Sequence, residues 1–559
     1  MVKRILGAIH RQIGELHEAA YVLAIFAFAA QLLSLVRDRL FAHIFGASTT
    51  LDIYYAAFRI PDLVFISLGS LVSAFVLIPF LTRQLSESTE KAHIFIKDIT
   101  SAFFYVLVGV SVVLVIVVPQ LVRLVYPGFS GTDFETLVML TRLLLLSPII
   151  LGLSNITATI VQVRERFVLY ALTPVVYNTG IIIGILFLYP SFGILGLGIG
   201  VLIGALFHVG VQIPSLLREG LLPHLGWPSD WKRVWSIVSV SLPRTLALAA
   251  NQGALLVLVA LAALMPEGSI SIFNLSLNLQ GAPLGIIGVS YSVAAFPTLA
   301  RLFSNGNREE FLKHMSDAIR HVLFWSFPAT VLFIVLRAQI VRTVLGSGAF
   351  SWDDTRLTAA ALALFVVSLS AQGLMLLFVR GYYAAGKTAR PLIVNLASAL
   401  ITIGVAILMG NVMAGVPMIR YFMEALFRVA DVPGTEVLAL PLGYSIGFLV
   451  NAGIFWFLFR HDFGGHIPKG LYTTMWQNFS ASIIAGAVAY GFLGVFAGIF
   501  ELSTTLGIFL QGLFSGIIGI LAWTLVLTVL KNSEWHEMRL ALSHRFWREK
   551  PIGSEPAEL

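Results

Sequence analysis

Fourteen long apolar stretches, separated by short polar connections, fill almost the whole chain. A membrane hydrocarbon core about 30 Å thick requires about 20 apolar residues per helix, and a helix satisfies its own backbone hydrogen bonds, as that core demands. The pattern therefore predicts an all-α polytopic membrane protein with about 14 transmembrane helices. The expected spans are residues 19–45, 51–82, 98–126, 135–162, 167–189, 192–216, 234–264, 269–300, 315–345, 357–385, 390–413, 437–460, 472–499 and 503–530.

The basic residues are divided unevenly between the connections, which predicts the orientation. If the N-terminus is cytoplasmic, 25 of the 36 Lys and Arg lie in or beside cytoplasmic connections and 6 lie in or beside outer ones. Because cytoplasmic loops carry an excess of Lys and Arg, we expect both termini to be cytoplasmic. This distribution also explains the net charge of +7 without a nucleic-acid partner, since anionic lipid head groups would face those loops.

The outer connection at residues 414–436 has a pattern of its own. Arg420, Glu424, Arg428 and Asp431 stand there among Met, Phe and Leu. Such a mixture predicts a short amphipathic helix on the membrane surface.

Composition agrees with a membrane protein and excludes several kinds of chemistry. Of the 559 residues, 58% are hydrophobic and 12% are charged, and the mean hydropathy is +0.89. The absence of cysteine excludes disulfides, thiolate chemistry and cysteine metal sites. No phosphate-binding loop is present, so the chain is not expected to be an ATP-driven pump. No histidine spacing typical of a metal site and no Ser/His/Asp arrangement is evident, so we expect neither a metal nor an enzyme.

Three short patterns recur in the same order at offsets of 217 to 219 residues, which indicates an internal duplication. The pairs are 79–83 with 297–301, 120–123 with 339–342, and 174–178 with 391–395. They relate the second, third and fifth spans to the eighth, ninth and eleventh. Each unit therefore has six helices, and an even number makes the two halves parallel repeats, an architecture common in transporters with the substrate site between the halves.

The duplication predicts three parts of the chain. They are a six-helix lobe at residues 1–216, a second six-helix lobe at 217–460, and two additional helices with a cytoplasmic tail at 461–559.

Charged residues inside the predicted spans gather in the first two helices. They are Arg37, Asp38, Arg39, Asp52, Arg59 and Asp62. Because a charge inside the membrane is costly and usually faces a cavity or a partner, we expect Arg37 and Arg59 to face a polar cavity. Asp52 and Arg59 are seven residues apart and therefore share a helix face. For Arg39 and Asp62, a place near the outer interface is an equal alternative.

The second repeat carries carboxamides where the first carries charges. Asn251, Asn278 and Asn395 could line a cavity or bind a cation through their carbonyl oxygens, and hydrogen bonding between helices is the alternative for each of them. Arg244 follows Pro243, which is expected to kink its helix and free a carbonyl, either as a gate or as a static bend.

The first two spans also carry a recognisable pattern. It consists of Val36-Arg37-Asp38, Ala42, Phe45-Gly46-Ala47-Ser48, Asp52 and Ala57-Phe58-Arg59-Ile60-Pro61. This pattern resembles the MurJ/MviN family, lipid II flippases of the multidrug/oligosaccharidyl-lipid/polysaccharide exporter (MOP) superfamily. A looser likeness continues through the eleventh span, at Arg166-Phe167, Pro174, Asn178, Pro243, Gly285 through Pro297, and Gly381 through Pro391.

The resemblance implies a fold, a substrate and a place in the cell. The fold would be two six-helix lobes around a central cationic cavity, with the last two helices forming a lipid-facing groove. The substrate would be lipid II, a peptidoglycan precursor on undecaprenyl pyrophosphate, moved to the outer leaflet of the bacterial inner membrane by alternating access. Arg37, Asp52 and Arg59 match the family's cavity Arg, Asp and basic positions, and the guanidinium fork suits a pyrophosphate. The implied partners are lipid II, membrane lipids and cell-wall synthesis proteins.

Several residues depart from the family pattern. Gln31 and Asn278 stand where better-known members have Arg, and Val64 through Ser70 lacks the family's charged residues. Either Arg142 or Arg244 takes over a pyrophosphate contact, or the substrate differs. Since Asn251 and Asn395 stand near the position of carboxylates that bind sodium in some members, we expect no cofactor and favour membrane potential over a cation gradient as the energy source.

The leading hypothesis from the sequence is therefore a lipid II flippase. The alternatives are an exporter of another polyprenyl-linked oligosaccharide or of a drug, and a non-transporting scaffold of a cell-wall complex. A drug exporter would be expected to place acidic groups in its cavity. In the first lobe, by contrast, the basic residues of the predicted spans equal or slightly outnumber the acidic ones.

Overall fold

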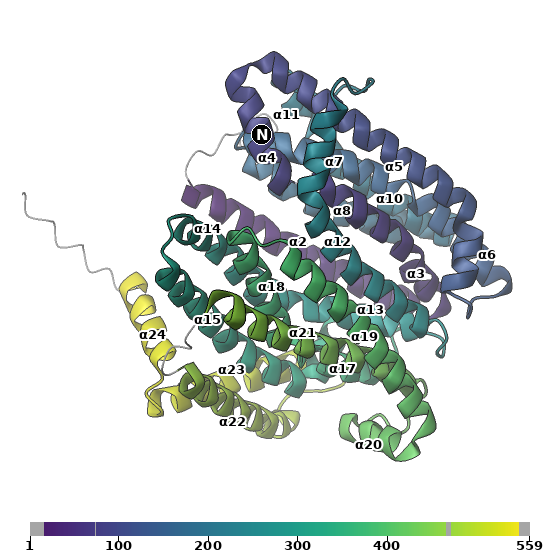
Figure 1. The fold of residues 1–559 in the computed structure, drawn as a ribbon. Coiled ribbons are helices and arrows are strands. Elements are labelled where there is room, and N and C mark those ends of the chain that lie inside the picture. The colour runs from purple at the N-terminus through teal and green to yellow at the C-terminus, as the bar shows by residue number, and fades with distance from the viewer. Residues whose placement is uncertain (1–15, 73, 465–470, 547–559) are drawn as a thin grey trace, which may run out of the picture. The chain divides into compact units, whose positions relative to one another are not determined.

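The computed structural model describes residues 16–72, 74–464 and 471–546, and within these ranges it contains helices and no strand (Figure 1). Twelve of these helical segments are long and apolar enough to cross a membrane, or 13 if the bent pair α17 (Trp352–Val366) and α18 (Leu369–Ala384), which meet at 43°, counts as one span. The predicted all-α polytopic fold is thus confirmed. The additional expected span is α2 (Leu16–Phe45), a continuous helix of 30 residues whose second half carries three neighbouring charges.

The described residues form two compact units. The first contains the chain through Ala282 together with Val341–Phe365 and Gly386–Ile454, and the second contains Pro283–Ile340, Val366–Ala385 and the chain from Phe455. The division of the chain into repeats at residues 216 and 460 stays a prediction, because it concerns sequence duplication rather than compactness.

The helices of the first unit come from both sequence repeats. Besides α2 and α17 they are α3 (Thr49–Val64), α4 (Ala74–Glu87), α5 (Thr89–Val125), α6 (Gly131–Leu144), α7 (Ser147–Val163), α8 (Phe167–Ile183), α9 (Tyr189–Phe192), α10 (Ile194–Gly210), α11 (Ile213–Arg218), α12 (Trp231–Ala262), α13 (Ser269–Leu284), α19 (Ala389–Gly415), α20 (Pro417–Phe427) and the first part of α21 (Ala439–Phe463). A cluster of buried aliphatic and aromatic side chains joins α4, α5, α7 and α12.

Close packing of α8 against α10 depends on glycine. Gly180 on α8 and Gly184, the residue directly after α8, face Gly200 and Gly204 on α10, four residues apart in each pair. A Cβ atom on Gly200 would lie 2.9 Å from the backbone nitrogen of Gly184 and 3.1 Å from the carbonyl oxygen of Gly180. Helices in membranes gain their association energy from such close backbone contact, because lipid provides no hydrophobic drive between them.

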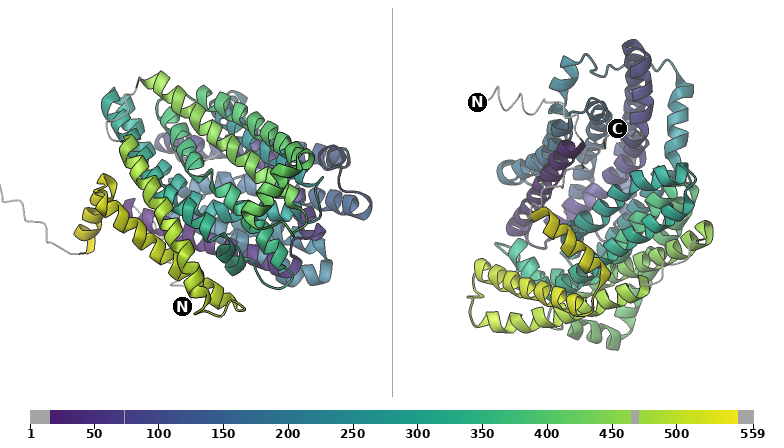
Figure 2. Two further views of the ribbon diagram at one scale, coloured as in Figure 1. Left: turned by 90° about the horizontal axis from the view of Figure 1, so that it is seen from below. Right: turned by 90° about the vertical axis from the view of Figure 1, so that its left-hand side faces the viewer.

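The second unit is built around α15 (Arg308–Val335), α22 (Leu471–Ala497) and α23 (Thr505–Val529). The latter two lie side by side along their length (Figures 1 and 2). Phe324, Trp523 and Leu527 are buried where these helices meet. The unit also contains α14 (Ser290–Ser304), α18, α24 (Ser533–Phe546) and the first half of α16 (Arg337–Val344).

Three spans contain a π-helical segment in mid-course. These segments are η1 (Phe65–Gly69), η3 (Gly184–Leu188) and η4 (Gly285–Val289). The first and last follow α3 and α13, which are both 16 residues long. The second and eighth predicted spans, which the duplication relates, therefore break at the same distance from their starts.

Connections that the sequence assigns to the outer side meet one another in the first unit. The Glu267 carboxylate accepts a hydrogen bond from the Thr49 backbone nitrogen at 2.9 Å, and this bond lowers the pKa of Glu267. The Ala349 backbone nitrogen donates to the His43 carbonyl oxygen at 2.8 Å. Residues 45–49, 263–268 and 346–351 are thus neighbours, which agrees with their assignment to the same side of the membrane.

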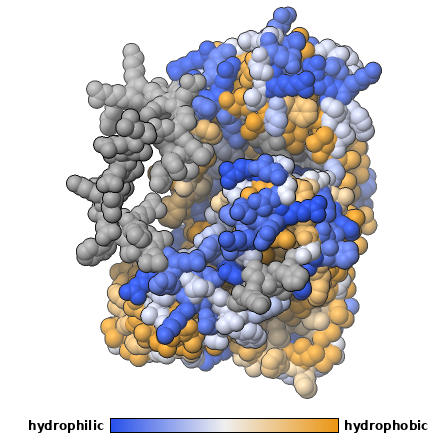
Figure 3. Space-filling model, turned by 60° about the vertical axis from the view of Figure 1, so that its left-hand side comes forward, coloured by the Kyte–Doolittle hydropathy of each residue, from blue (hydrophilic) through white to orange (hydrophobic). Residues whose placement is uncertain are grey.

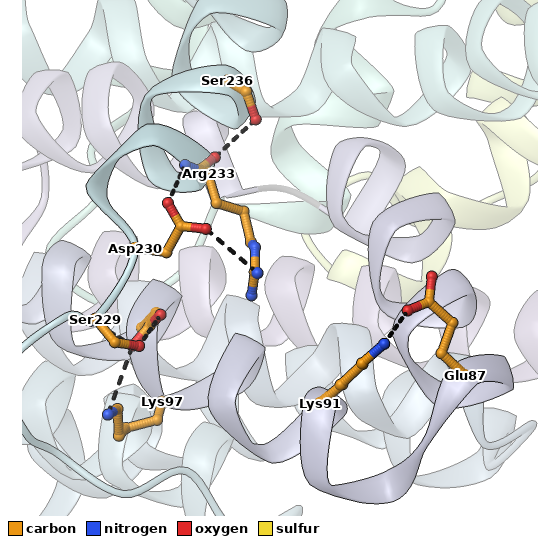
Figure 4. A network of polar contacts seen from close by, with 8 residues as sticks. Glu87, Lys91, Lys97, Ser229, Asp230, Arg233 and Ser236 are labelled. Carbon is orange, nitrogen blue, oxygen red and sulfur yellow. Dashed lines mark hydrogen bonds and ion pairs between the residues drawn. The ribbon is translucent and has the colours of Figure 1, made fainter.

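Two connections assigned to the other side also meet (Figure 4). Ser229, just before α12, donates from its backbone nitrogen and its hydroxyl to the buried Asp98 of α5, each at 2.9 Å to Oδ1. Lys97 lies 3.7 Å from the same carboxylate, and Asp230 begins α12 by accepting from the Arg233 backbone nitrogen at 3.0 Å. The beginnings of α5 and α12 are therefore held together.

Large apolar side chains are exposed over broad areas of the protein surface (Figure 3). Examples are Ile116 on α5, Leu400 on α19 and Leu525 on α23, which are 67%, 71% and 65% exposed. An exterior of this kind is unfavourable in water and suits a lipid environment. The chain is a multi-pass membrane protein.

Candidate functional site

A polar cavity of about 230 Å³ lies within the first unit, between α2, α3, α8 and α13. Its lining combines two arginines, one carboxylate, two carboxamides and a group of aromatic rings. The lining residues are Arg37, Phe41, Tyr54, Tyr55, Phe58, Arg59, Asp62, Tyr177, Ile181, Asn274 and Asn278.

Arg37 is held at this cavity by partners from two helices. Its Nε and Nη2 donate to Asp38 Oδ1 at 3.0 and 2.8 Å. Its Nη1 donates to Asn178 Oδ1 on α8 at 3.0 Å, and Nη2 also reaches Ser34 Oγ at 3.1 Å. The guanidinium is therefore oriented before any ligand arrives, although one-fifth of the side chain stays exposed.

Arg59 also lines the cavity and is held in a similar way. Its Nη2 donates to Asn274 Oδ1 on α13, while its buried Nε has no hydrogen-bond partner among the described residues. Buried polar groups without a partner are uncommon in native structures and call for an explanation such as a ligand or water. Arg59 thus has donor capacity left for an anionic group.

The same local arrangement fixes both arginines. Asn178 Nδ2 donates to the Pro174 carbonyl oxygen, four residues earlier on its own helix, at 2.9 Å. Asn274 Nδ2 donates to the Ile270 carbonyl oxygen, also four residues earlier, at 2.8 Å. In each case the amide nitrogen is committed to the helix backbone, so the amide oxygen is turned toward a guanidinium.

Carboxylates balance the charge of the two arginines. Asp62 lines the cavity, and Asp38 lies at its edge, where its Oδ2 accepts from Asn278 Nδ2 at 3.2 Å. Asp38 shares its other oxygen with Arg37. Without a ligand, the cavity therefore holds two cations and two anions and is close to neutral, in contrast to the cationic cavity expected from the resemblance.

Asp52 belongs to a different environment. It is 6% exposed and does not line the cavity. Its carboxylate accepts from the Gly268 nitrogen at 2.8 Å and from the nitrogen and hydroxyl of Ser271 at 2.7 and 2.6 Å. These donors lie directly before α13 and in its first turn, so Asp52 caps that helix from α3. Arg39 likewise binds backbone, since it donates to the Thr343 and Val344 carbonyl oxygens at the end of α16.

The other residues proposed from sequence lie away from the cavity. Arg142 on α6 is exposed and donates to the Val115 carbonyl oxygen at 2.9 Å. Arg244 and Asn251 on α12 do not contribute to the lining, nor does Asn395 on α19. The Asn395 Oδ1 atom is buried without a hydrogen-bond partner in the described part of the chain, although α12 and α19 pack together.

Several lining residues were not proposed from the sequence. Tyr55, Arg59 and Asp62 are spaced by four and three residues, which places them on one face of α3. Their spacing could have indicated Tyr55. Tyr177 on α8 gives no such signal, because its position depends on how α8 packs against α2 and α3.

The family model described as lipid II flippase MurJ matches residues 41–511 of this chain. The chain belongs to the MurJ family. Among its relatives is a probable lipid II flippase MurJ from Rickettsia prowazekii (strain Madrid E), 25% identical over 442 residues, which cover 78% of this chain and 83% of the relative. Another, from Thermotoga maritima, is 29% identical over 399 residues, or 69% of this chain and 78% of the relative.

Solved structures support the same fold. A structure of lipid II flippase MurJ in an inward closed conformation matches 93% of this chain and 100% of its own, with a TM-score of 0.73 at 22% identity. An inward-facing multidrug resistance MATE family transporter of the MOP superfamily matches 78% of this chain and 94% of its own, with a TM-score of 0.63 at 15% identity. These likenesses concern the fold alone.

Proposed function

We propose that this protein is a flippase that moves lipid II, the lipid-linked peptidoglycan precursor, from the cytoplasmic to the outer leaflet during cell-wall synthesis. Membership of the MurJ family supports this function. The single structural observation that supports it best is the cavity in which Arg37 and Arg59 are held by Asn178 and Asn274. Neither the family match nor the relatives favour the alternatives, which are export of another lipid-linked oligosaccharide or of a drug, and a scaffold without transport.

The two arginines suit a pyrophosphate. Guanidinium stays charged at every physiological pH and donates two parallel hydrogen bonds to phosphate oxygens. Bonds of this kind are strong in a cavity with little water. Tyr54, Tyr55 and Tyr177 add phenolic hydroxyls around the same space, and Asn278 adds an amide that also binds Asp38. The protein's role is binding and translocation, without a bond being made or broken.

Asp38 gives the cavity a way to release its ligand. In the absence of ligand it holds Arg37 through Nε and Nη2, the two atoms that a phosphate would use. A pyrophosphate must therefore displace Asp38 from Arg37, and Asp38 competes for Arg37 again when the lipid leaves. This competition lowers the net affinity for the diphosphate and favours turnover over permanent binding.

Of the possible energy sources, the membrane potential agrees best with the neutral residues Asn251 and Asn395. Moving one elementary charge through 100 mV is worth about 2.3 kcal/mol, which is enough to shift a conformational equilibrium about 50-fold. Asn251 and Asn395 are neutral, so a dedicated cation site has no carboxylate at these positions. In vesicles, collapsing the potential at constant sodium should slow flipping. Slowing by sodium removal alone would instead direct attention to Asn395 and its unpartnered oxygen.

The experiment that tests the function is flipping of a fluorescent lipid II analogue in reconstituted vesicles. Arg37→Ala and Arg59→Ala should each abolish flipping while the protein still inserts, and Lys at either position should restore it only in part. Arg142→Ala is the matched control, because Arg142 lies away from the cavity. Normal flipping by the double variant Arg37→Ala/Arg59→Ala would overturn the proposal.

A further inference from the structure

The amphipathic helix expected at residues 414–436 is present as α20 (Pro417–Phe427), and its two faces differ sharply. Met418, Tyr421, Phe422 and Leu426 are 81%, 66%, 64% and 56% exposed. Their spacing of three and four residues places them on one face of the helix. Four large apolar side chains, two of them aromatic, therefore point away from the protein.

The opposite face of α20 is tied down by polar contacts. Glu424 is 4% exposed, and its Oε1 accepts from Arg420 Nε at 2.8 Å and from Thr435 Oγ1 at 2.6 Å. Arg420 Nη1 also lies 3.4 Å from Glu436 Oε1. These contacts join α20 to the segment that leads into α21. They therefore oppose a rotation of the helix about its axis that would bury its apolar face.

A second attachment holds the C-terminal end of α20. Arg428, which ends the helix in the left-handed conformation at φ +59°, offers its carbonyl oxygen to Arg356 Nε at 3.2 Å and to Nη2 at 2.5 Å. Arg356, on α17, also forms a two-pronged ion pair with Asp431 at 2.7 and 2.5 Å. One arginine thus fixes both the cap of α20 and the turn that follows it.

The position of α20 along the chain identifies what covers its exposed face. It begins directly after α19 and is followed, after a short connection, by α21, and both are membrane-spanning helices. Ile393, Leu396, Leu400 and Ile407 form an exposed apolar stripe along α19. The outward face of α20 continues this lipid-facing surface at the level where the span ends.

We infer that α20 is an interfacial membrane anchor whose outward face lies among lipids at the boundary between head groups and acyl chains. Interfacial helices bury their apolar face about 5–10 Å deep at this boundary, and Tyr is enriched there because its ring is apolar and its hydroxyl is polar. Since Arg356, Arg420 and Glu424 hold α20 rigidly, its depth in the lipid would set the level of the adjoining ends of α17, α19 and α21.

The absence of cysteine from the chain makes a direct test simple, because each engineered cysteine is the only thiol. Met418→Cys and Phe422→Cys would each be labelled with an environment-sensitive fluorophore in lipid vesicles. The matched control is Asp353→Cys, an exposed polar position at the start of α17 on the same side of the membrane. Quenching would be measured with spin-labelled lipids and, separately, with aqueous iodide.

The expected result is a blue-shifted emission at positions 418 and 422 that spin-labelled lipids quench more than iodide does, with the reverse ratio at position 353. Iodide quenching at 418 and 422 as strong as at 353 would show that the face is in water and would overturn the inference. Protection from both quenchers would also overturn it, since it would mean that a second copy or another protein covers the face. The measurement needs no flipping, so it stands independently of the proposed function.

Discussion

Ser271 donates two hydrogen bonds to one carboxylate oxygen of Asp52, from its backbone nitrogen at 2.7 Å and from its hydroxyl at 2.6 Å. The two residues lie 219 positions apart in the chain. Asp52 therefore connects α3 to the first turn of α13, and we predict that its role is structural.

Asp52→Ala should destabilise the protein rather than weaken substrate binding. The substitution leaves the Gly268 and Ser271 donors buried without partners, which costs about 1–3 kcal/mol. Thermal unfolding in detergent should shift to a lower temperature, and Asp52→Asn should shift it less because one acceptor oxygen remains. Lipid II affinity of the surviving folded protein should be unchanged. A variant of unaltered stability that no longer bound the lipid would contradict this role.

Asp38→Asn should increase the affinity for pyrophosphate-bearing lipid and slow its release. The substitution removes the charge that holds Arg37 in the ligand-free cavity, so a phosphate meets less competition. Binding would be measured in detergent with lipid II, and turnover in vesicles. The control is Arg37→Ala/Asp38→Asn, in which the gain should disappear. A gain that persists without Arg37 would show that Asp38 acts through another group.

Gly200→Val should reduce the amount of folded protein. Its side chain would meet the backbone of Gly180 on α8 and of Gly184 directly after α8, and overpacking of this kind typically costs about 1–3 kcal/mol. Gly210→Val, at the end of the same helix, is the matched control, because no atom lies within 4 Å of its added Cβ. Size-exclusion profiles of the two variants should differ, and equal profiles would contradict the close packing of α8 and α10.

The attachment of α20 should resist moderate acid. The hydrogen bonds from Arg356 lower the pKa of Asp431 to about 2, whereas an unperturbed aspartate titrates near about 3.9. A depressed pKa means that the ion pair stabilises the folded state fully above about pH 4 and is lost only as the pH falls toward 2. A spin label at Pro433→Cys should stay immobile down to about pH 4. In Arg356→Gln the label should be mobile at every pH, and release near pH 6 in the parent would disprove this assignment.

Both termini should be cytoplasmic. The uneven division of Lys and Arg between the connections predicts this orientation. A reporter active only in the cytoplasm, fused after Lys531, should therefore be active, while one active only outside should not. The opposite pattern would reverse the sides assigned to α20 and to the contacts between α5 and α12.

The sequence predicted the class of fold and two of the cavity's charged residues for clear physical reasons. Long apolar runs have few solutions other than membrane-spanning helices, and Arg37 and Arg59 were singled out because buried charge requires compensation. Asp52 met the same criterion but does not line the cavity. Its compensation comes from backbone N–H groups of Gly268 and Ser271, and no side-chain pattern in the sequence reveals such donors.

The remaining cavity residues depend on packing between helices. Asn178 and Asn274 reach the arginines from helices that are distant in the sequence, 141 and 215 residues away. A carboxamide in a span is more often a bridge between helices than a ligand, so its residue type alone is not diagnostic. The balance of charge in the cavity was likewise not apparent, since it depends on which oxygen of Asp38 faces Arg37.

The π-helical segments η1 and η4 make the two related spans easier to bend at the same position along each span. Each follows a helix of 16 residues and is bounded by a glycine, Gly69 or Gly285. In a π-helical turn the regular hydrogen-bond ladder is interrupted, so such a turn bends more easily than the α-helix around it. The first unit ends at Ala282, inside α13, and two further residues of that helix separate this boundary from η4. The most easily bent turn of this span therefore follows closely after the boundary of the first unit.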